Sequence, residues 1–135
     1  MYIFLIFLYC TQQSRHIKTL TELFKLFFVS SHAITSDVNL AETAKAAEFF
    51  LADGVIVTGT STGAPANHMD MLEVKKSVNI PVLIGSGVTL ENVQTYIQAS
   101  GMIIGSYFKE SGHWCGAVEF NRVKSFMAKV ERLRI

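Results

Sequence analysis

Cysteine, proline and charged residues are all scarce in this sequence. Its 135 residues include two cysteines, Cys10 and Cys115, two prolines and 17% charged residues. The cysteines lie far apart, with no CxxC pair and no histidine at ligand spacing, so neither a disulfide framework nor a zinc site is indicated. We therefore expect no metal, no cofactor and a reducing, cytoplasmic environment.

A strong charge of one sign is also missing. The formal net charge is +1, whereas proteins that bind nucleic acids or acidic membranes usually carry a basic stripe. No partner of either kind is predicted. Half of the residues are hydrophobic, which is enough for a chain of this length to bury the core of one domain.

The first 29 residues differ from the rest and open with an apolar run from Met1 to Cys10. The run is too short to span a bilayer, which takes about 20 residues, and it lacks the positive flank of a secretory signal. Glu22 is the one acidic residue here, so a mitochondrial or other organelle-targeting peptide is an alternative. We favour a non-native start, produced by a faulty gene model, for residues 1–29.

From Ser30 onward, short apolar segments alternate with polar-capped amphipathic ones, which is typical of successive βα units. Strands are expected at residues 53–59, 80–84 and 101–104. Helices are expected at residues 38–51 with Asp37 or Asn39 as N-cap, at 68–78 with Asn67 as N-cap, from Thr89 onward, and at 119–133. The last helix carries an apolar stripe that should cover the sheet: Phe120, Val123, Phe126, Met127, Val130 and Leu133.

Two of the expected strands end in glycine and serine, as Gly85-Ser86-Gly87 and as Gly105-Ser106. Glycine leaves the backbone N–H groups accessible, and a following helix adds its positive N-terminus, so such loops suit an anion. In (β/α)₈ barrels the loops after strands seven and eight commonly form a phosphate site together. A single loop of this kind is more often a tight turn, but the pair predicts phosphate binding, with the two serine hydroxyls as donors.

Several blocks of the sequence resemble the BtpA/SgcQ family. They are Leu51 to Gly59 with Thr62-Gly63, Ile80 to Val88, Ile104 to Lys109, Gly112-His113-Trp114, and Arg122 to Met127. Members of that family are phosphate-binding-type barrels and include a photosystem I biogenesis protein. The resemblance covers residues 30–134 and is lost before Ser30, where the family generally has Lys and His.

The resemblance implies that residues 30–135 are the C-terminal half of a (β/α)₈ barrel, with strands five to eight. An open doubly wound parallel sheet is the alternative fold. The family suggests either recognition of a small phosphorylated metabolite, with or without catalysis, or a non-catalytic assembly role. An inactive truncated fragment is a third interpretation. Open barrel edges would also favour a homo-oligomer.

Four further residues are candidates for contact with a substrate. His32 would follow strand five as an acid–base group, although loop histidines are more often solvated or capping residues. Thr58 and Thr62 follow strand six and could contact hydroxyl groups, or simply form a polar turn. Lys109 follows strand eight and could neutralise phosphate, although a solvated lysine is equally consistent with the sequence.

Overall fold

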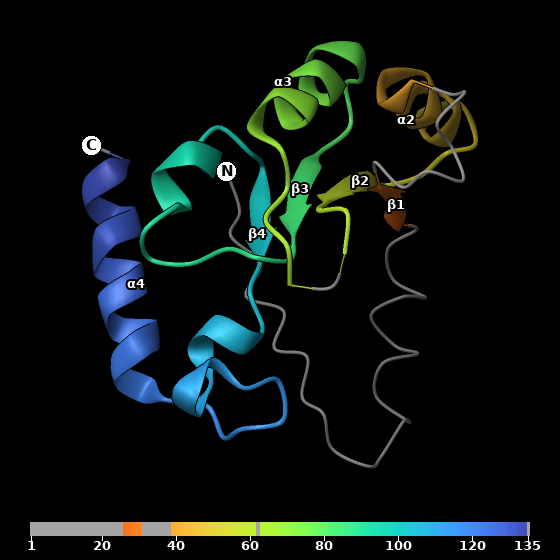
Figure 1. The fold of residues 1–135 in the computed structure, drawn as a ribbon. Helices are drawn as coiled ribbons and strands as arrows, with labels where there is room; N and C mark the ends of the chain where they lie inside the picture. The colour runs from red at the N-terminus through yellow and green to blue at the C-terminus, as the bar shows by residue number, and fades with distance from the viewer. Residues whose placement is uncertain (1–25, 31–38, 62, 135) are drawn as a thin grey trace.

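The computed structural model describes residues 26–30, 39–61 and 63–134 of the chain (Figure 1). Along the sequence the elements are β1 (Leu26–Ser30), α2 (Leu40–Phe49), β2 (Gly54–Thr58), α3 (His68–Ser77), β3 (Val82–Gly85), η2 (Val93–Tyr96), β4 (Gly101–Ile103), η3 (Ser106–Phe108), η4 (Glu110–Gly112) and α4 (Phe120–Leu133). The expected boundary at Ser30 therefore falls at the last residue of a strand.

The four strands form one parallel sheet in the order β1-β2-β3-β4. Each strand pairs with the next one along the chain, and no strand reverses the order. A doubly wound sheet would show such a reversal, whereas consecutive parallel strands joined by crossover segments are the repeating unit of a (β/α)₈ barrel. The strand order thus agrees with the half-barrel prediction.

Helices α2 and α3 are each capped by an asparagine that the sequence offers as a candidate N-cap. The Asn39 side chain accepts a hydrogen bond from the N–H of Ala41 at 2.8 Å, and the Asn67 side chain accepts one from Met69 at 2.8 Å. Each asparagine thus satisfies a helix N–H that has no partner within the helix. The two helices pack against each other beside the sheet (Figure 1).

The two faces of the sheet carry different side chains because successive residues of a strand point to opposite sides. Val55, Val57, Val82 and Ile84 belong to the main core, together with buried residues of α2, α3 and α4. Ile56 points the other way, and its Cγ2 atom would lie 2.8 Å from a Cβ added at Gly85. Ile56 is nevertheless 1% exposed, so this second face of the sheet is also covered.

The C-terminal helix α4 covers the end of the core, as its apolar stripe predicts. Phe126 and Val130 are fully buried. The prediction is wrong at both ends of the stripe, however, since Phe120 at the start of α4 is 74% exposed and Leu133 at its end is 37% exposed. The helix is longer than the layer it covers, so periodicity alone overestimates its buried face.

The expected helix from Thr89 is mostly wrong, since only the 3₁₀ turn η2 forms in this segment. The Asn92 side chain accepts from the N–H of Thr89 and donates to the carbonyl of Gly87, both at 2.8 Å. Later amides bond three residues back, as from Thr95 to Asn92. The chain re-enters the sheet at Gly101, 12 positions after Thr89 (101 − 89), whereas 15 positions separate Asn67 from the start of β3 at Val82 (82 − 67).

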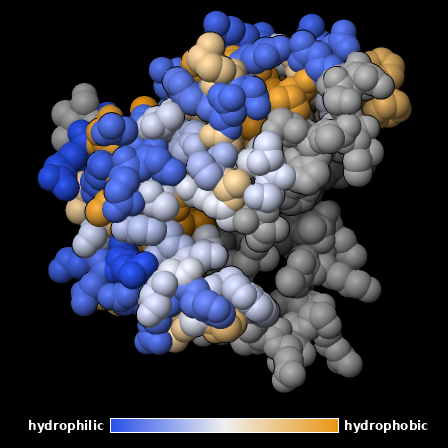
Figure 2. Space-filling model, viewed as in Figure 1, coloured by the Kyte–Doolittle hydropathy of each residue, from blue (hydrophilic) through white to orange (hydrophobic). Residues whose placement is uncertain are grey.

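Figure 2, viewed as Figure 1, shows hydrophilic residues over much of the visible surface and a hydrophobic region near α2. Phe49, Phe50 and Leu51, at the C-terminal end of α2, are 81%, 76% and 77% exposed. Within the described residues, none of the helices is both long enough and apolar enough to cross a membrane.

Candidate functional site

The candidate site lies at the carboxyl ends of the parallel strands. Thr58, the last residue of β2, pairs with Gly85, the last residue of β3, and Gly85 pairs in turn with Ile103 of β4. Both predicted glycine loops start from this row, since Ser86 follows Gly85 directly and Gly105 is the second residue after Ile103. The sheet register thus places the two loops at the same edge (Figure 1).

The loop after β3 has a backbone conformation that requires glycine at one position. Ser86 and Gly87 have φ angles of 73° and 63°, in the left-handed region. A Cβ at Gly87 would lie 2.4 Å from the nitrogen and 2.5 Å from the Cα of Pro65. Because Pro65 belongs to the loop after β2, the contact holds the loops after β2 and β3 against each other.

Backbone N–H groups remain available in both loops. Within the part of the chain that the structure describes, no residue accepts a hydrogen bond from the N–H of Ser86, Gly87, Gly105 or Ser106. Ser106 is exposed and Ser86 is half-buried. Unpaired N–H groups are hydrogen-bond donors for an oxyanion, and they need no side-chain charge. These backbone N–H groups are the feature of the two loops that favours binding of an anion.

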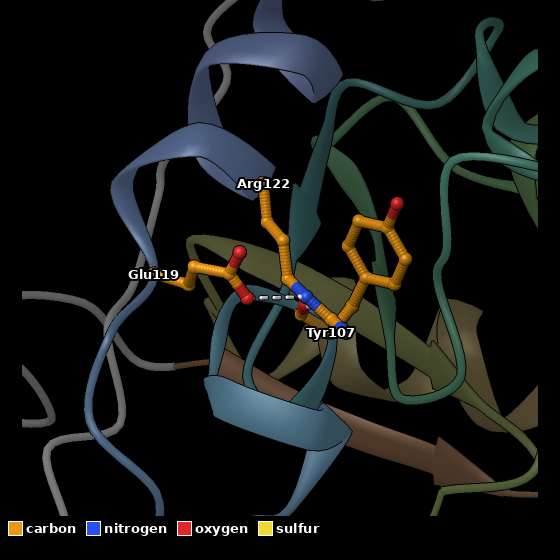
Figure 3. Close-up of polar contacts among 3 residues, drawn as sticks. All are labelled: Tyr107, Glu119 and Arg122. Atoms are coloured by element: carbon orange, nitrogen blue, oxygen red, sulfur yellow. Dashed lines mark hydrogen bonds and ion pairs between the residues drawn. The ribbon is translucent and has the colours of Figure 1, made fainter.

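The loop after β4 is fixed to the start of α4 by Arg122, as Figure 3 shows. The Arg122 Nε atom donates to Glu119 Oε2 at 2.8 Å, and Nη1 donates to the backbone carbonyl of Tyr107 at 3.1 Å. The guanidinium carbon also lies 5.6 Å from the centre of the Tyr107 ring. Arg122 therefore determines how the chain leaves Ser106, rather than offering a free cation.

Tyr107 and Lys129 connect this region to the loop after β3. Burial raises the pKa of the Tyr107 phenol, and the negative charge of Glu91 raises it further. The positive charge of Arg122 and a hydrogen bond from the backbone of Leu90 oppose the rise. The Lys129 ammonium donates to the Leu90 carbonyl at 2.7 Å. Leu90 thus links the loop after β3 to both η3 and α4.

The other predicted site residues lie in different environments. Thr58 is at the strand edge, and its Cγ2 atom is 3.3 Å from the Cβ position of Gly85. Lys109 is 7% exposed, and its ammonium donates to the Trp114 carbonyl at 2.6 Å. This hydrogen bond ties Lys109 to the loop that follows it. His32 and Thr62 lie outside the described residues. Among the residues described, no three His, Cys, Asp or Glu side chains gather as a metal site.

Sequence reasoning missed the residues that support the two loops. Pro65 packs on Gly87, Asn92 braces the Gly87 carbonyl, and Arg122 and Lys129 reach the loops from α4. The Asn92 contact is local and could have been expected from an asparagine three residues after Thr89. The other three connect segments far apart in the sequence, for which the sequence holds no local signal.

These features define the class of the protein as the C-terminal half of a (β/α)₈ barrel. GGGPS from Thermoplasma volcanium has the same fold, with a TM-score of 0.52 and 21% identity, over 68% of this chain and 38% of that one. The particular family follows from the sequence comparison. Residues 10–132 match the BtpA family, and the chain belongs to it.

Individual relatives agree with this assignment. A mitochondrial protein of Caenorhabditis elegans is 45% identical over 105 residues, which are 78% of this chain and 38% of the relative. The photosystem I biogenesis protein BtpA of Synechocystis is 39% identical over 79 residues, which are 57% of this chain and 28% of that protein. The chain thus spans less than two-fifths of the length of these relatives. The family match also begins at residue 10, inside the segment expected to lie outside the family.

Proposed function

We propose that the edge formed by the loops after β3 and β4 binds the phosphate group of a small phosphorylated metabolite. The observation that carries the proposal is a set of backbone N–H groups in two glycine-containing loops that start from one row of the sheet. None of the described residues accepts a hydrogen bond from these groups. Gly85, Ser86, Gly87, Gly105 and Ser106 would surround the phosphate oxygens. Barrels of this type commonly bind phosphate at this position.

A role in assembly is the second candidate. It is supported by the 39% identity to the Synechocystis protein that is named for photosystem I biogenesis. Such a role needs a protein partner rather than a phosphate ester. The exposed cluster of Phe49, Phe50 and Leu51 is apolar surface of a kind that could contact a partner. Phosphate binding at the opposite loops and assembly through α2 are separable by mutation.

Isothermal titration calorimetry with inorganic phosphate and with phosphate monoesters, at constant ionic strength, tests the first proposal. We expect saturable binding that Ser106→Ala weakens by about 10- to 150-fold, since one hydrogen bond to a charged group contributes about 1.5–3 kcal/mol. Ser125→Ala, which changes an exposed serine of α4, is the matched control and should bind normally. Absence of saturable binding in the unsubstituted chain, or equal weakening in both variants, would contradict the proposal.

For the location, we propose the cytoplasm, with the mitochondrion as the alternative that the Caenorhabditis elegans relative supports through its name. Microscopy of the chain with a C-terminal fluorescent tag distinguishes the two. Removing residues 1–25 should leave a cytoplasmic pattern unchanged and should abolish a mitochondrial one, if these residues act as a targeting peptide.

A further inference from the structure

A histidine and a cysteine meet in the loop between β4 and α4, away from the glycine loops. The Nδ1 atom of His113 lies 2.9 Å from the Sγ atom of Cys115, within hydrogen-bond distance. Both side chains are exposed. In the imidazole tautomer that carries its proton on Nε2, the Nδ1 atom accepts a hydrogen bond from the thiol. A base at contact distance and access for a reagent from solvent are the two requirements of a reactive cysteine.

The loop backbone holds the pair in place. An antiparallel bridge between Lys109 and Val118 closes the loop, and the N–H of Gly116 donates to the His113 carbonyl at 2.9 Å. The Trp114 ring stacks on the His113 ring with the centroids 6.1 Å apart and the planes at 28°. These contacts restrict the imidazole, so the distance between the histidine and the cysteine is part of the folded arrangement.

The charges around the loop are mixed, and one of them is the buried cation of Lys109. The Lys109 ammonium bonds the Trp114 carbonyl, one residue before Cys115. Arg122 Nη1 lies 3.9 Å from the Cβ position of Gly112, but Glu119 pairs with this guanidinium. Glu110 is an exposed carboxylate in the same loop.

We propose that Cys115 and His113 form a thiol–disulfide exchange site for low-molecular-weight disulfides such as glutathione disulfide. The imidazole takes the thiol proton, and the sulfur of Cys115 attacks one sulfur of the disulfide. The S–S bond of the reagent breaks, and its second half leaves as a thiolate that takes up the proton from His113. The products are a mixed disulfide on Cys115 and one free small thiol, so no external oxidant or reductant is consumed.

The test measures the rate of exchange with an aromatic disulfide that releases a coloured thiolate. The protein carries Cys10→Ser, so that Cys115 is its one thiol, and the rate is divided by that of free glutathione in the same solution. We expect the folded protein to react about tenfold faster than the same protein unfolded in urea. Mass spectrometry of a digest should place the adduct on Cys115.

The second arm replaces the histidine. His113→Gln should slow exchange about tenfold, while His68→Gln, a matched change on α3, should leave the rate unchanged. Circular dichroism verifies that both variants are folded. The proposal is overturned by a folded rate equal to the unfolded rate, or by a His113→Gln rate equal to that of the parent. If the His113→Gln variant does not fold, the exchange rates of the folded and unfolded parent still test the proposal.

Discussion

The sharpest prediction concerns Gly87, where a single methyl group should strongly destabilise the fold. Substitution by alanine places a Cβ 2.4, 2.5 and 2.6 Å from three backbone atoms of Pro65 and Ala64. Ordinary contact begins at 3.4 Å, so the loop after β2 has to move by about 1 Å, the difference between 3.4 and 2.4 Å. Backbone cannot yield as a flexible side chain does, and overpacking of this kind costs about 1–3 kcal/mol.

Substitutions at two other glycines distinguish the cost of this close contact from the cost of the left-handed backbone conformation. Gly63 also has a positive φ, 81°, but no atom of the other described residues lies within 4 Å of its Cβ position. Gly63→Ala should therefore cost about 0.5–1 kcal/mol, since left-handed strain of about 1–2 kcal/mol is partly offset by reduced entropy of the unfolded chain. Gly105 has neither a positive φ nor a close neighbour, so Gly105→Ala should change stability by less than about 0.5 kcal/mol.

Adding the overpacking cost of about 1–3 kcal/mol to the net conformational cost of about 0.5–1 kcal/mol gives a loss of about 1.5–4 kcal/mol for Gly87→Ala. Urea unfolding followed by circular dichroism measures the free energy of unfolding of all three variants against the parent. The expected order of stability is Gly105→Ala, then Gly63→Ala, then Gly87→Ala. A Gly87→Ala protein within about 0.5 kcal/mol of Gly63→Ala would show that Pro65 does not pack on Gly87 as described.

Two further predictions concern buried or capping polar groups. Tyr96→Phe should lower the free energy of unfolding by about 1–3 kcal/mol, because the Tyr96 hydroxyl donates to the Ala66 carbonyl at 2.6 Å and its loss leaves a buried acceptor unpaired. Burial raises the pKa of Tyr96, so the folded state disfavours the phenolate. The contribution of Tyr96 to the free energy of unfolding should be fully present below the unfolded pKa of about 10. It should decline as the pH rises through the higher pKa of the folded state. Urea unfolding at alkaline pH should detect this decline in the parent but not in Tyr96→Phe. Asn67→Ala should lower the thermal midpoint, with a loss of about 0.5–2 kcal/mol, because Met69 loses its capping acceptor; an unchanged midpoint would mean that water replaces the cap.

The features that could be predicted from the sequence are those encoded by neighbouring residues. The sequence predicts Asn67 as one N-cap and leaves Asp37 or Asn39 for the other, and in the structure Asn67 and Asn39 accept the hydrogen bonds of the caps. The apolar run at residues 53–59 was expected as a strand and contains β2. Caps and strand periodicity depend on a few adjacent side chains, which the chain order alone brings together.

The sequence by itself determined the alternation of strands and helices and the presence of glycine in the loops after β3 and β4. Only the tertiary structure decided what surrounds those loops. Lys109, which the sequence offers as a candidate for contact with phosphate, donates to the Trp114 carbonyl, and Pro65 packs on Gly87 from a separate loop. The side chain of Phe120 fits the periodicity of a buried face, yet it lies beyond the edge of the core. Each of these outcomes depends on the distance between segments that are far apart in the chain, and such distances are set by how the layers pack rather than by any local pattern.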